Sequence, residues 1–302
     1  MSPDEEPKRG SSSSDLLMVF LVFPSNTRDA KRGGGPTKVP KEKFVMIISG
    51  AKFGGSMFGV PKLAAASFSA PITTPSLHLI VMENEKQNKK LKILCLHGFR
   101  TSGAILQKEV EKWPQPLLQK LDLVFMDGPY PAQGKSGVDG IFEPPFYEWF
   151  QADEEYKEFY NFEECLAKIE KFMLTHGPFD GILGFSQGAM LAATIPGMQR
   201  EGVALTKVPK VKFLIIASGA KFGSSKFGIP KLASASFSTP ITTPSLHIIG
   251  ETDIVKEEGI GLLESFVDPL IIHHPNGHTI PMLDDKSLEI FYNFIAKIQD
   301  LP

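Results

Sequence analysis

The pentapeptide Gly184-Phe185-Ser186-Gln187-Gly188 places a serine between two glycines, after the apolar run 181–183 and before the alanine-rich stretch 189–193. A strand, a sharp turn and a helix in that order are typical of a nucleophile elbow, which lifts the serine hydroxyl clear of the sheet. Both glycines are needed because the turn leaves no room for a Cβ atom, and the serine backbone is expected to be strained. The pattern predicts that Ser186 is a nucleophile.

A serine hydroxyl attacks a carbonyl group only when a base takes its proton, and an acid must fix the tautomer of that base. After a nucleophile elbow the chain order is serine, acid, histidine, so both partners should follow Ser186. His278 lies in a glycine-flanked loop between the last expected strand and the final helix. It is the predicted base, with His274, at the end of a strand, as the alternative.

The predicted acid is Asp253, which stands three residues past Gly250, just after an apolar strand. Glu251 and Asp268 are the alternatives. Glu251 is nearer the strand and should point away from the serine, whereas Asp268 precedes its strand and should lie at the opposite edge of the sheet.

Acyl transfer also needs two N–H groups that converge on the developing oxyanion. One is expected from Gln187, at the start of the elbow helix, where the helix dipole favours negative charge. The other is expected from the loop after the first strand, His97-Gly98-Phe99, with the Phe99 amide as the predicted donor. His97 precedes the elbow, so we expect it to orient this loop by hydrogen bonds.

Alternating strands and helices must position these residues. Apolar runs typical of buried parallel strands lie at 92–96, 121–126, 180–184, 211–217, 245–249 and 269–273. Amphipathic segments between and after them predict helices, including one over 287–298. Pro196 and Gly197 are expected to interrupt the elbow helix. This alternation predicts an α/β fold with a mostly parallel central sheet flanked by helices.

A long loop runs from Pro129 to Phe150 and ends in an aromatic cluster. Loops of this length are usually functional or disordered, and the aromatic content favours the wall of a substrate pocket. The substrate-binding candidates are Phe146, Tyr147, Trp149 and Phe150 in the loop and Met190 in the elbow helix, although such clusters are more often plain core.

The composition excludes several classes of function. The chain has 302 residues, a net charge of −2 and 42% hydrophobic residues, so neither nucleic acid nor an anionic membrane is an expected partner. The apolar run 16–23 is too short to span a bilayer, which takes about 20 residues. Cys95 and Cys165 make no disulfide framework and favour a reducing, cytoplasmic or nuclear compartment. Without metal-ligand spacing, a dinucleotide fingerprint or a P-loop, no metal or cofactor is expected.

Residues 37–80 nearly duplicate residues 206–249, with 34 of 44 positions identical at an offset of 169. The copy contains no elbow and no terminal histidine, and Asn84 stands where the later copy leads to Asp253. We therefore predict a disordered tail at 1–36, a non-catalytic partial duplicate plus linker at 37–90, and a catalytic domain at 91–302. The tail is polar and low in complexity, so it buries too little apolar surface to offset its ordering entropy.

Four separated motifs resemble the family of serine hydrolases known from yeast, which has esterase-like relatives in plants. They are Lys92 to Arg100, Gly184 to Gly188, Thr243 to Gly250 leading to Asp253, and Gly277-His278. The resemblance spans about residues 91–300, and residues 1–90 depart from the family pattern. It implies an α/β-hydrolase fold with little or no lid and a carboxylesterase that acts on small acyl esters, or a thioesterase, with Ser186, Asp253 and His278 as the triad.

Two other classes of function are compatible with the sequence. A ligand-binding receptor on a hydrolase scaffold would keep the triad, but such receptors use a large helical lid. The matching connection here, residues 219–243, is short and lacks helical periodicity. A non-catalytic interaction protein would result if residues 37–90 displaced a strand or covered the pocket. The oligomeric state is left open by the sequence.

Overall fold

The structure is a computed structural model that describes residues 90–299 together with two short segments, 19–21 and 44–46. The chain divides into two units, residues 1–87 and 88–302. In the first unit, β1 (Val19–Leu21) pairs antiparallel with β2 (Phe44–Met46). The rest of the predicted tail and of the duplicated segment lies outside the described residues, so the predicted division at 36 and 90 stays a prediction.

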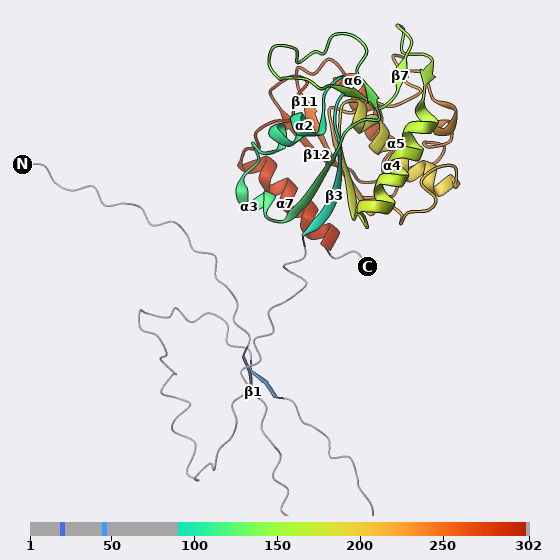
Figure 1. The fold of residues 1–302 in the computed structure, drawn as a ribbon. Helices are drawn as coiled ribbons and strands as arrows, with labels where there is room; N and C mark the ends of the chain where they lie inside the picture. Colours follow the sequence, from blue (N-terminus) through green and yellow to red (C-terminus); the bar gives the residue numbers. More distant parts are fainter. Residues whose placement is uncertain (1–18, 22–43, 47–89, 300–302) are drawn as a thin grey trace, which may run out of the picture. The chain divides into compact units, whose positions relative to one another are not determined.

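Six parallel strands form the central sheet of the second unit (Figure 1). They lie in the order β12-β11-β10-β9-β3-β4, and every neighbouring pair is parallel. Each predicted strand is confirmed to within two residues at either end. In chain order the strands are β3 (Leu91–Leu96), β4 (Leu121–Met126), β9 (Gly181–Phe185), β10 (Phe213–Ala217), β11 (Ser245–Gly250) and β12 (Leu270–His274).

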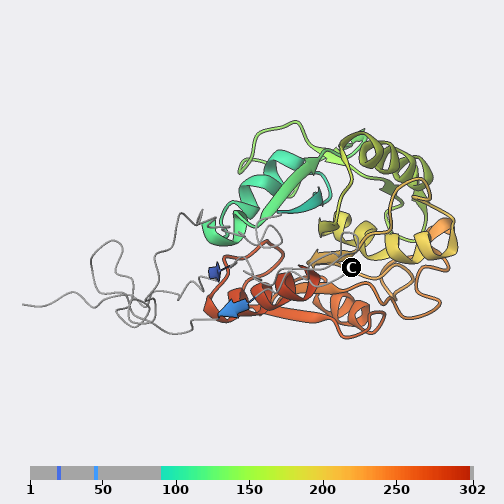
Figure 2. The ribbon, with the colours of Figure 1, turned by 90° about the horizontal axis from the view of Figure 1, so that it is seen from below.

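Helices cover both faces of this sheet, as Figures 1 and 2 show from two directions. On one face the strands pack against α2 (Gly103–Val110), α3 (Gln115–Leu118) and α7 (Asp285–Gln299). On the other face they pack against α4 (Phe162–His176), α5 (Gln187–Glu201) and α6 (Lys256–Leu263). The predicted parallel sheet flanked by helices is therefore confirmed. Among the described residues, none of the helices combines the length and the apolar character needed to cross a bilayer.

The strand order reverses beside β3. The chain passes from β3 to β4 on one side, whereas β9, β10, β11 and β12 follow on the other. In open α/β sheets, ligands bind at the carboxyl ends of the strands where the order reverses. The loop after β3 and the turn after β9 meet at this point, so the fold itself brings Phe99 and Ser186 to one place.

The predicted interruption of the elbow helix is wrong, because α5 continues through Pro196 to Glu201. Gly197, which follows the proline, lies against the backbone of Ser236. A Cβ atom at this position would contact the Ser236 carbonyl oxygen and lie 2.6 Å from the Ser236 Cα atom. The glycine thus lets the connection 219–243 pack directly on the helix. That connection contains one 3₁₀ turn, Lys231–Ala233, and no longer helix.

Two helical glycines should respond to the same substitution with opposite signs. Gly197→Ala should lower the free energy of unfolding by about 1–3 kcal/mol, because the new methyl group overlaps the Ser236 backbone. Gly261→Ala, in α6, should raise it by about 0.5–1 kcal/mol, because nothing lies within 4 Å of its ideal Cβ atom. Urea unfolding of both variants and the wild type measures the difference. Equal effects would contradict the close approach at Gly197.

Candidate active site

Ser186 occupies a strained turn between β9 and α5. Its φ and ψ angles are 54° and −115°, in a region that side-chain-bearing residues rarely adopt. A Cβ atom at Gly184 would contact the Gly188 carbonyl oxygen, and one at Gly188 would contact the Leu96 carbonyl oxygen. Both glycines are therefore required by contact as well as by pattern. The turn is fixed by two backbone bonds, Ser186 N–H to Ala217 O and Gly188 N–H to His97 O, each 3.1 Å long.

The structure brings Ser186, His278 and Asp253 into one hydrogen-bonded chain. The Ser186 Oγ atom lies 2.8 Å from His278 Nε2, and His278 Nδ1 lies 2.8 Å from Asp253 Oδ1. The three residues come from the loops after β9, β11 and β12, so 92 residues separate the serine from the histidine. The arrangement allows the imidazole to accept the serine proton at Nε2 while its Nδ1–H points at a carboxylate.

Asp253 is held in its charged form although it is buried. Burial raises the pKa of its carboxyl group, but the hydrogen bonds from His278 and from the Val255 amide outweigh that effect and hold the pKa at about 2. A carboxylate that is ionised at neutral pH accepts the His278 Nδ1–H and leaves Nε2 as the hydrogen-bond acceptor for Ser186. The charge of Asp253 therefore fixes the tautomer that the serine needs.

The alternative acids and the alternative base lie elsewhere. Glu251 contacts Lys256 and His273 through its two carboxylate oxygens, at 2.7 and 2.9 Å. Asp268 lies before β12, in a turn with a φ angle of 47°. The His274 ring is buried, and neither of its nitrogens finds a hydrogen-bond partner among the described residues. None of the three joins the chain of hydrogen bonds to Ser186.

His97 holds the loop after β3 in the way the sequence predicts. Its Nε2 atom accepts the Gly128 N–H at 2.8 Å, so the proton is on Nδ1, which donates to the Gly98 carbonyl oxygen at 2.7 Å. Burial lowers the pKa of His97 to about 4, against the opposing effects of the Gly98 carbonyl and the Asp127 charge. The ring is therefore neutral at neutral pH, as the bond from Gly128 requires.

The two predicted oxyanion donors border the same cavity as the serine. Phe99 and Gln187 both line it, together with Ser186 and His278. Within residues 90–299, neither the backbone N–H of Phe99 nor that of Gln187 donates to a protein acceptor. Both N–H groups are thus free to meet a ligand beside the serine.

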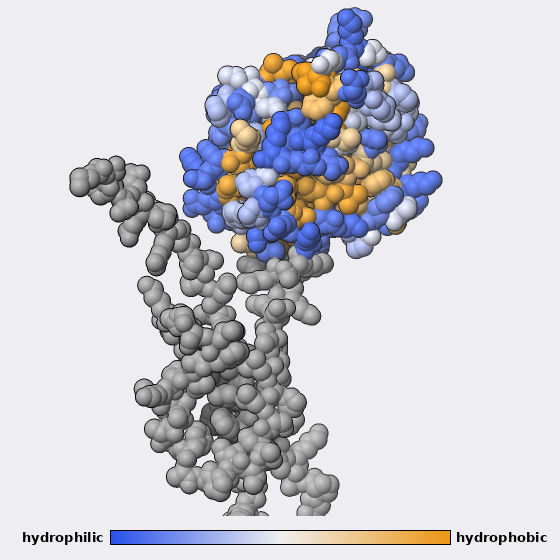
Figure 3. Space-filling view, turned by 60° about the vertical axis from the view of Figure 1, so that its left-hand side comes forward, coloured by the Kyte–Doolittle hydropathy of each residue, from blue (hydrophilic) through white to orange (hydrophobic). Residues whose placement is uncertain are grey.

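This cavity has a volume of about 360 Å³ and mostly apolar walls. Met190 and Phe150 line it as expected. Its other apolar walls come from segments in which the sequence showed no site, namely Ala152, Tyr156, Phe159, Ala220, Phe227, Ile254 and Val255. Apolar side chains are also exposed near its mouth, among them Phe99 and Ile254. Hydrophobic surface is visible at this end of the unit, at the top of Figure 3.

Three of the predicted substrate-binding residues do not line the cavity. Trp149 is fully buried, and its indole N–H donates to the His97 carbonyl oxygen at 2.8 Å. Tyr147 borders a separate hollow beside α2 and pairs with Thr101. Phe146 is half-buried and lines neither hollow. Of the predicted aromatic residues in this loop, Phe150 is the one that lines the cavity together with Ser186.

Comparison with known proteins identifies the family. Residues 82–290 match the family model described as serine hydrolase (FSH1). The chain belongs to the serine hydrolase (FSH1) family. It is therefore a hydrolase, and its six-stranded parallel sheet with helices on both faces is the α/β-hydrolase fold that the motifs implied.

Relatives of this FSH1-family chain carry esterase names. Human esterase OVCA2 is 31% identical over 212 residues, which cover 64% of this chain and 90% of that protein. Esterase AGAP003155 of Anopheles gambiae is 30% identical over 203 residues, or 64% of this chain and 73% of that protein. Among solved structures, acyl-protein thioesterase 2 of Zea mays shares 18% identity over 70% of this chain and 95% of that chain, with a TM-score of 0.48.

His97 should make the protein sensitive to mild acid. Its pKa is about 6.5 in the unfolded chain and about 4 in the folded protein, so only the unfolded state binds the proton between these values. The free energy of unfolding should therefore fall as the pH is lowered through this window, by about 3 kcal/mol. His97→Gln, whose side-chain oxygen can accept from Gly128, should lack this component. Urea unfolding at pH 7 and pH 4 tests it, and an identical loss in both proteins would contradict the prediction.

Proposed function

We propose that this FSH1-family hydrolase is a serine carboxylesterase that cleaves small acyl esters through a Ser186–His278–Asp253 triad and an acyl-enzyme intermediate. The observation that carries the proposal is the pair of 2.8 Å contacts that link serine to histidine and histidine to a buried aspartate. The esterase names of the relatives support the same class of reaction.

In the first half of the proposed reaction, Ser186 Oγ attacks the ester carbonyl carbon while its proton moves to His278 Nε2. The Asp253 carboxylate stabilises the resulting imidazolium and remains ionised. The amides of Phe99 and Gln187 stabilise the oxyanion, with the start of α5 adding a favourable dipole. The tetrahedral intermediate then expels the alcohol, which takes its proton from His278.

In the second half, a water molecule attacks the acyl-enzyme and gives its proton to His278 Nε2. A second tetrahedral intermediate forms at the same two amides and releases the carboxylic acid, while His278 returns the proton to Ser186 Oγ. Each half uses the same base in the same tautomer, so the Asp253–His278 contact serves both.

The cavity favours an apolar acyl group. Aromatic and aliphatic side chains form most of its wall, and Lys226 is the cationic residue among those that line it. Burial of acyl carbons against this wall stabilises the complex by about 0.8 kcal/mol for each methylene group. A thioester with the same acyl group would contact the same wall. The alternative thioesterase activity would therefore differ from the esterase activity only in the leaving group, a thiol in place of an alcohol.

Two further proposals concern the chain around this domain. We assign the chemistry to residues 91–302 and no catalytic part to residues 1–90, because all the proposed catalytic groups come from the later segment. The described cysteines, Cys95 and Cys165, are free and buried, which supports a reducing compartment.

Ser186→Ala should abolish hydrolysis of p-nitrophenyl esters. Removal of the nucleophile should lower kcat by about 10³–10⁶-fold, because no acyl-enzyme can form. A panel of acyl esters and matched thioesters of graded chain length, run on wild type and variant, measures the loss and the preferred leaving group. A fluorophosphonate probe should label wild type at residue 186. A folded wild type that neither turns over esters nor takes the probe would leave a ligand-binding or non-catalytic role instead.

Asp253→Asn should lower kcat/KM by about 10³–10⁴-fold, because an amide at this position offers a donor and stabilises the wrong tautomer of His278. Since the pKa of Asp253 is about 2, its titration should add no limb to the pH–rate profile between pH 4 and 9. The matched control is Glu251→Gln, which removes the alternative acid and should change kcat/KM by less than about twofold. A larger loss in the control than in Asp253→Asn would reverse the assignment of the acid.

A further inference from the structure

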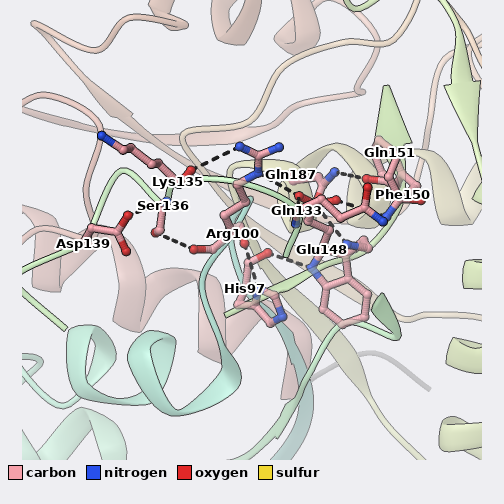
Figure 4. A network of polar contacts seen from close by, with 12 residues as sticks. His97, Arg100, Gln133, Lys135, Ser136, Asp139, Glu148, Phe150, Gln151 and Gln187 are labelled. Atoms are coloured by element: carbon pink, nitrogen blue, oxygen red, sulfur yellow. Dashed lines mark hydrogen bonds and ion pairs between the residues drawn. The ribbon is translucent and has the colours of Figure 1, made fainter. Parts of the chain in front are cut away.

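Glu148 is a buried carboxylate that the proposed reaction does not use. Its side chain is 1% exposed and accepts three hydrogen bonds. Arg100 Nε and the backbone N–H of Gln133 donate to Oε1 at 2.7 and 3.1 Å, and Gln151 Nε2 donates to Oε2 at 3.1 Å. A buried charge costs several kcal/mol unless it is paired and hydrogen-bonded in this way. Figure 4 shows these contacts beside His97 and Gln187.

Arg100, the cationic partner of Glu148, has a strained backbone. Its φ angle is 53°, which costs a residue with a side chain about 1–2 kcal/mol. Three contacts hold it there. The side chain donates to Glu148 through Nε and to the Lys135 carbonyl oxygen through Nη1 at 3.2 Å, while the Arg100 carbonyl oxygen accepts the Ser136 hydroxyl at 2.6 Å. Such strain persists only where surrounding contacts determine the conformation.

The strained residue directly follows Phe99, whose amide is a proposed oxyanion donor. The Arg100 guanidinium also lies 4.6 Å from the centre of the Phe99 ring, which lines the cavity. On the other side of Phe99, His97 is fixed by Gly128 and by the Trp149 indole. The orientation of the Phe99 N–H is therefore set on one side by His97, which donates to the Gly98 carbonyl of the same peptide group, and on the other side by Arg100, which is held by an ion pair.

We propose that the Arg100–Glu148 pair positions the Phe99 amide for the oxyanion, so that both are positioning residues of the hydrolytic reaction. An oxyanion donor works only when its N–H is aimed at the place where negative charge develops. The pair keeps the loop after β3 in that orientation before substrate arrives. Lysine cannot replace Arg100, because its ammonium group does not span Glu148 and the Lys135 carbonyl as the planar guanidinium does.

This inference rests on the proposed function, so the wild type and Ser186→Ala are measured first. Ester turnover that depends on Ser186 establishes the reaction. A wild type without turnover overturns the proposed function, and the catalytic role of the pair falls with it.

The test then compares Arg100→Lys, Arg100→Gln, Glu148→Gln and the double variant Arg100→Gln/Glu148→Gln. Each single variant should lower kcat by about 10–100-fold with KM changed less than about threefold, because the donor acts in the transition state rather than in substrate binding. Affinity for an alkyl trifluoromethyl ketone, which forms a tetrahedral adduct with the serine, should fall by the same factor as kcat/KM. The double variant should be no slower than the worse single variant, because the two residues act as one unit.

Arg200→Gln is the matched control, since it removes an arginine paired with a carboxylate, Glu201 at 2.9 Å, on a helix end away from the cavity. It should keep wild-type kcat. Circular dichroism and the urea midpoint show which variants are folded at the assay temperature. The inference is overturned if folded variants keep wild-type kcat, if only KM rises, or if the two single losses multiply in the double variant.

Discussion

The close approach of the first turn of α5 to the end of β3 is the constraint on which the site depends. The backbone at Gly188 lies so near Leu96 that no Cβ atom fits between them, and the Gly188 amide donates to the His97 carbonyl oxygen. This contact joins the turn that carries Ser186 directly to the loop that carries Phe99. The serine and the proposed oxyanion donors are therefore carried on backbone segments that contact one another directly.

The segment that follows β4 is fastened to that frame by polar bonds rather than by apolar packing alone. The Gln187 side chain accepts the Trp149 amide at 3.1 Å and donates to the Phe150 carbonyl oxygen at 2.9 Å. The Trp149 indole reaches the His97 carbonyl, and Glu148 binds Arg100. Three consecutive residues, Glu148, Trp149 and Phe150, thus connect the turn that carries Ser186 to the loop after β3. A substitution in any of them should therefore disturb the positions of Ser186 and Phe99 together with the cavity wall.

Much of this arrangement could be predicted from the sequence, because strands and the turns that follow them are set by short local patterns of residues. The strands follow from apolar runs. The meeting of Ser186, Asp253 and His278 follows because each comes after a strand of one parallel sheet, whose carboxyl ends lie at the same edge. The direction of Trp149 could not be predicted, because its indole N–H donates to the carbonyl oxygen of His97, 52 residues away. Glu148 gave no signal for a similar reason. A glutamate among aromatic residues suggests a loop surface, and only Arg100, 48 residues away, explains its burial. Pro196 misled the interpretation because local propensity was overruled by the packing of Gly197 on Ser236.

The later copy of the internal duplication, residues 206–249, forms part of the central sheet. The repeated stretch 206–249 supplies β10 and most of β11, and each of these strands already has a neighbour on both sides. Within the described sheet, hydrogen-bonding edges remain only at β4 and β12. The stretch also supplies the 219–243 connection, which contributes Ala220 and Phe227 to the cavity but none of the proposed triad. The copy at residues 37–80 therefore has no counterpart of Ser186, Asp253 or His278, which all lie outside the repeated residues.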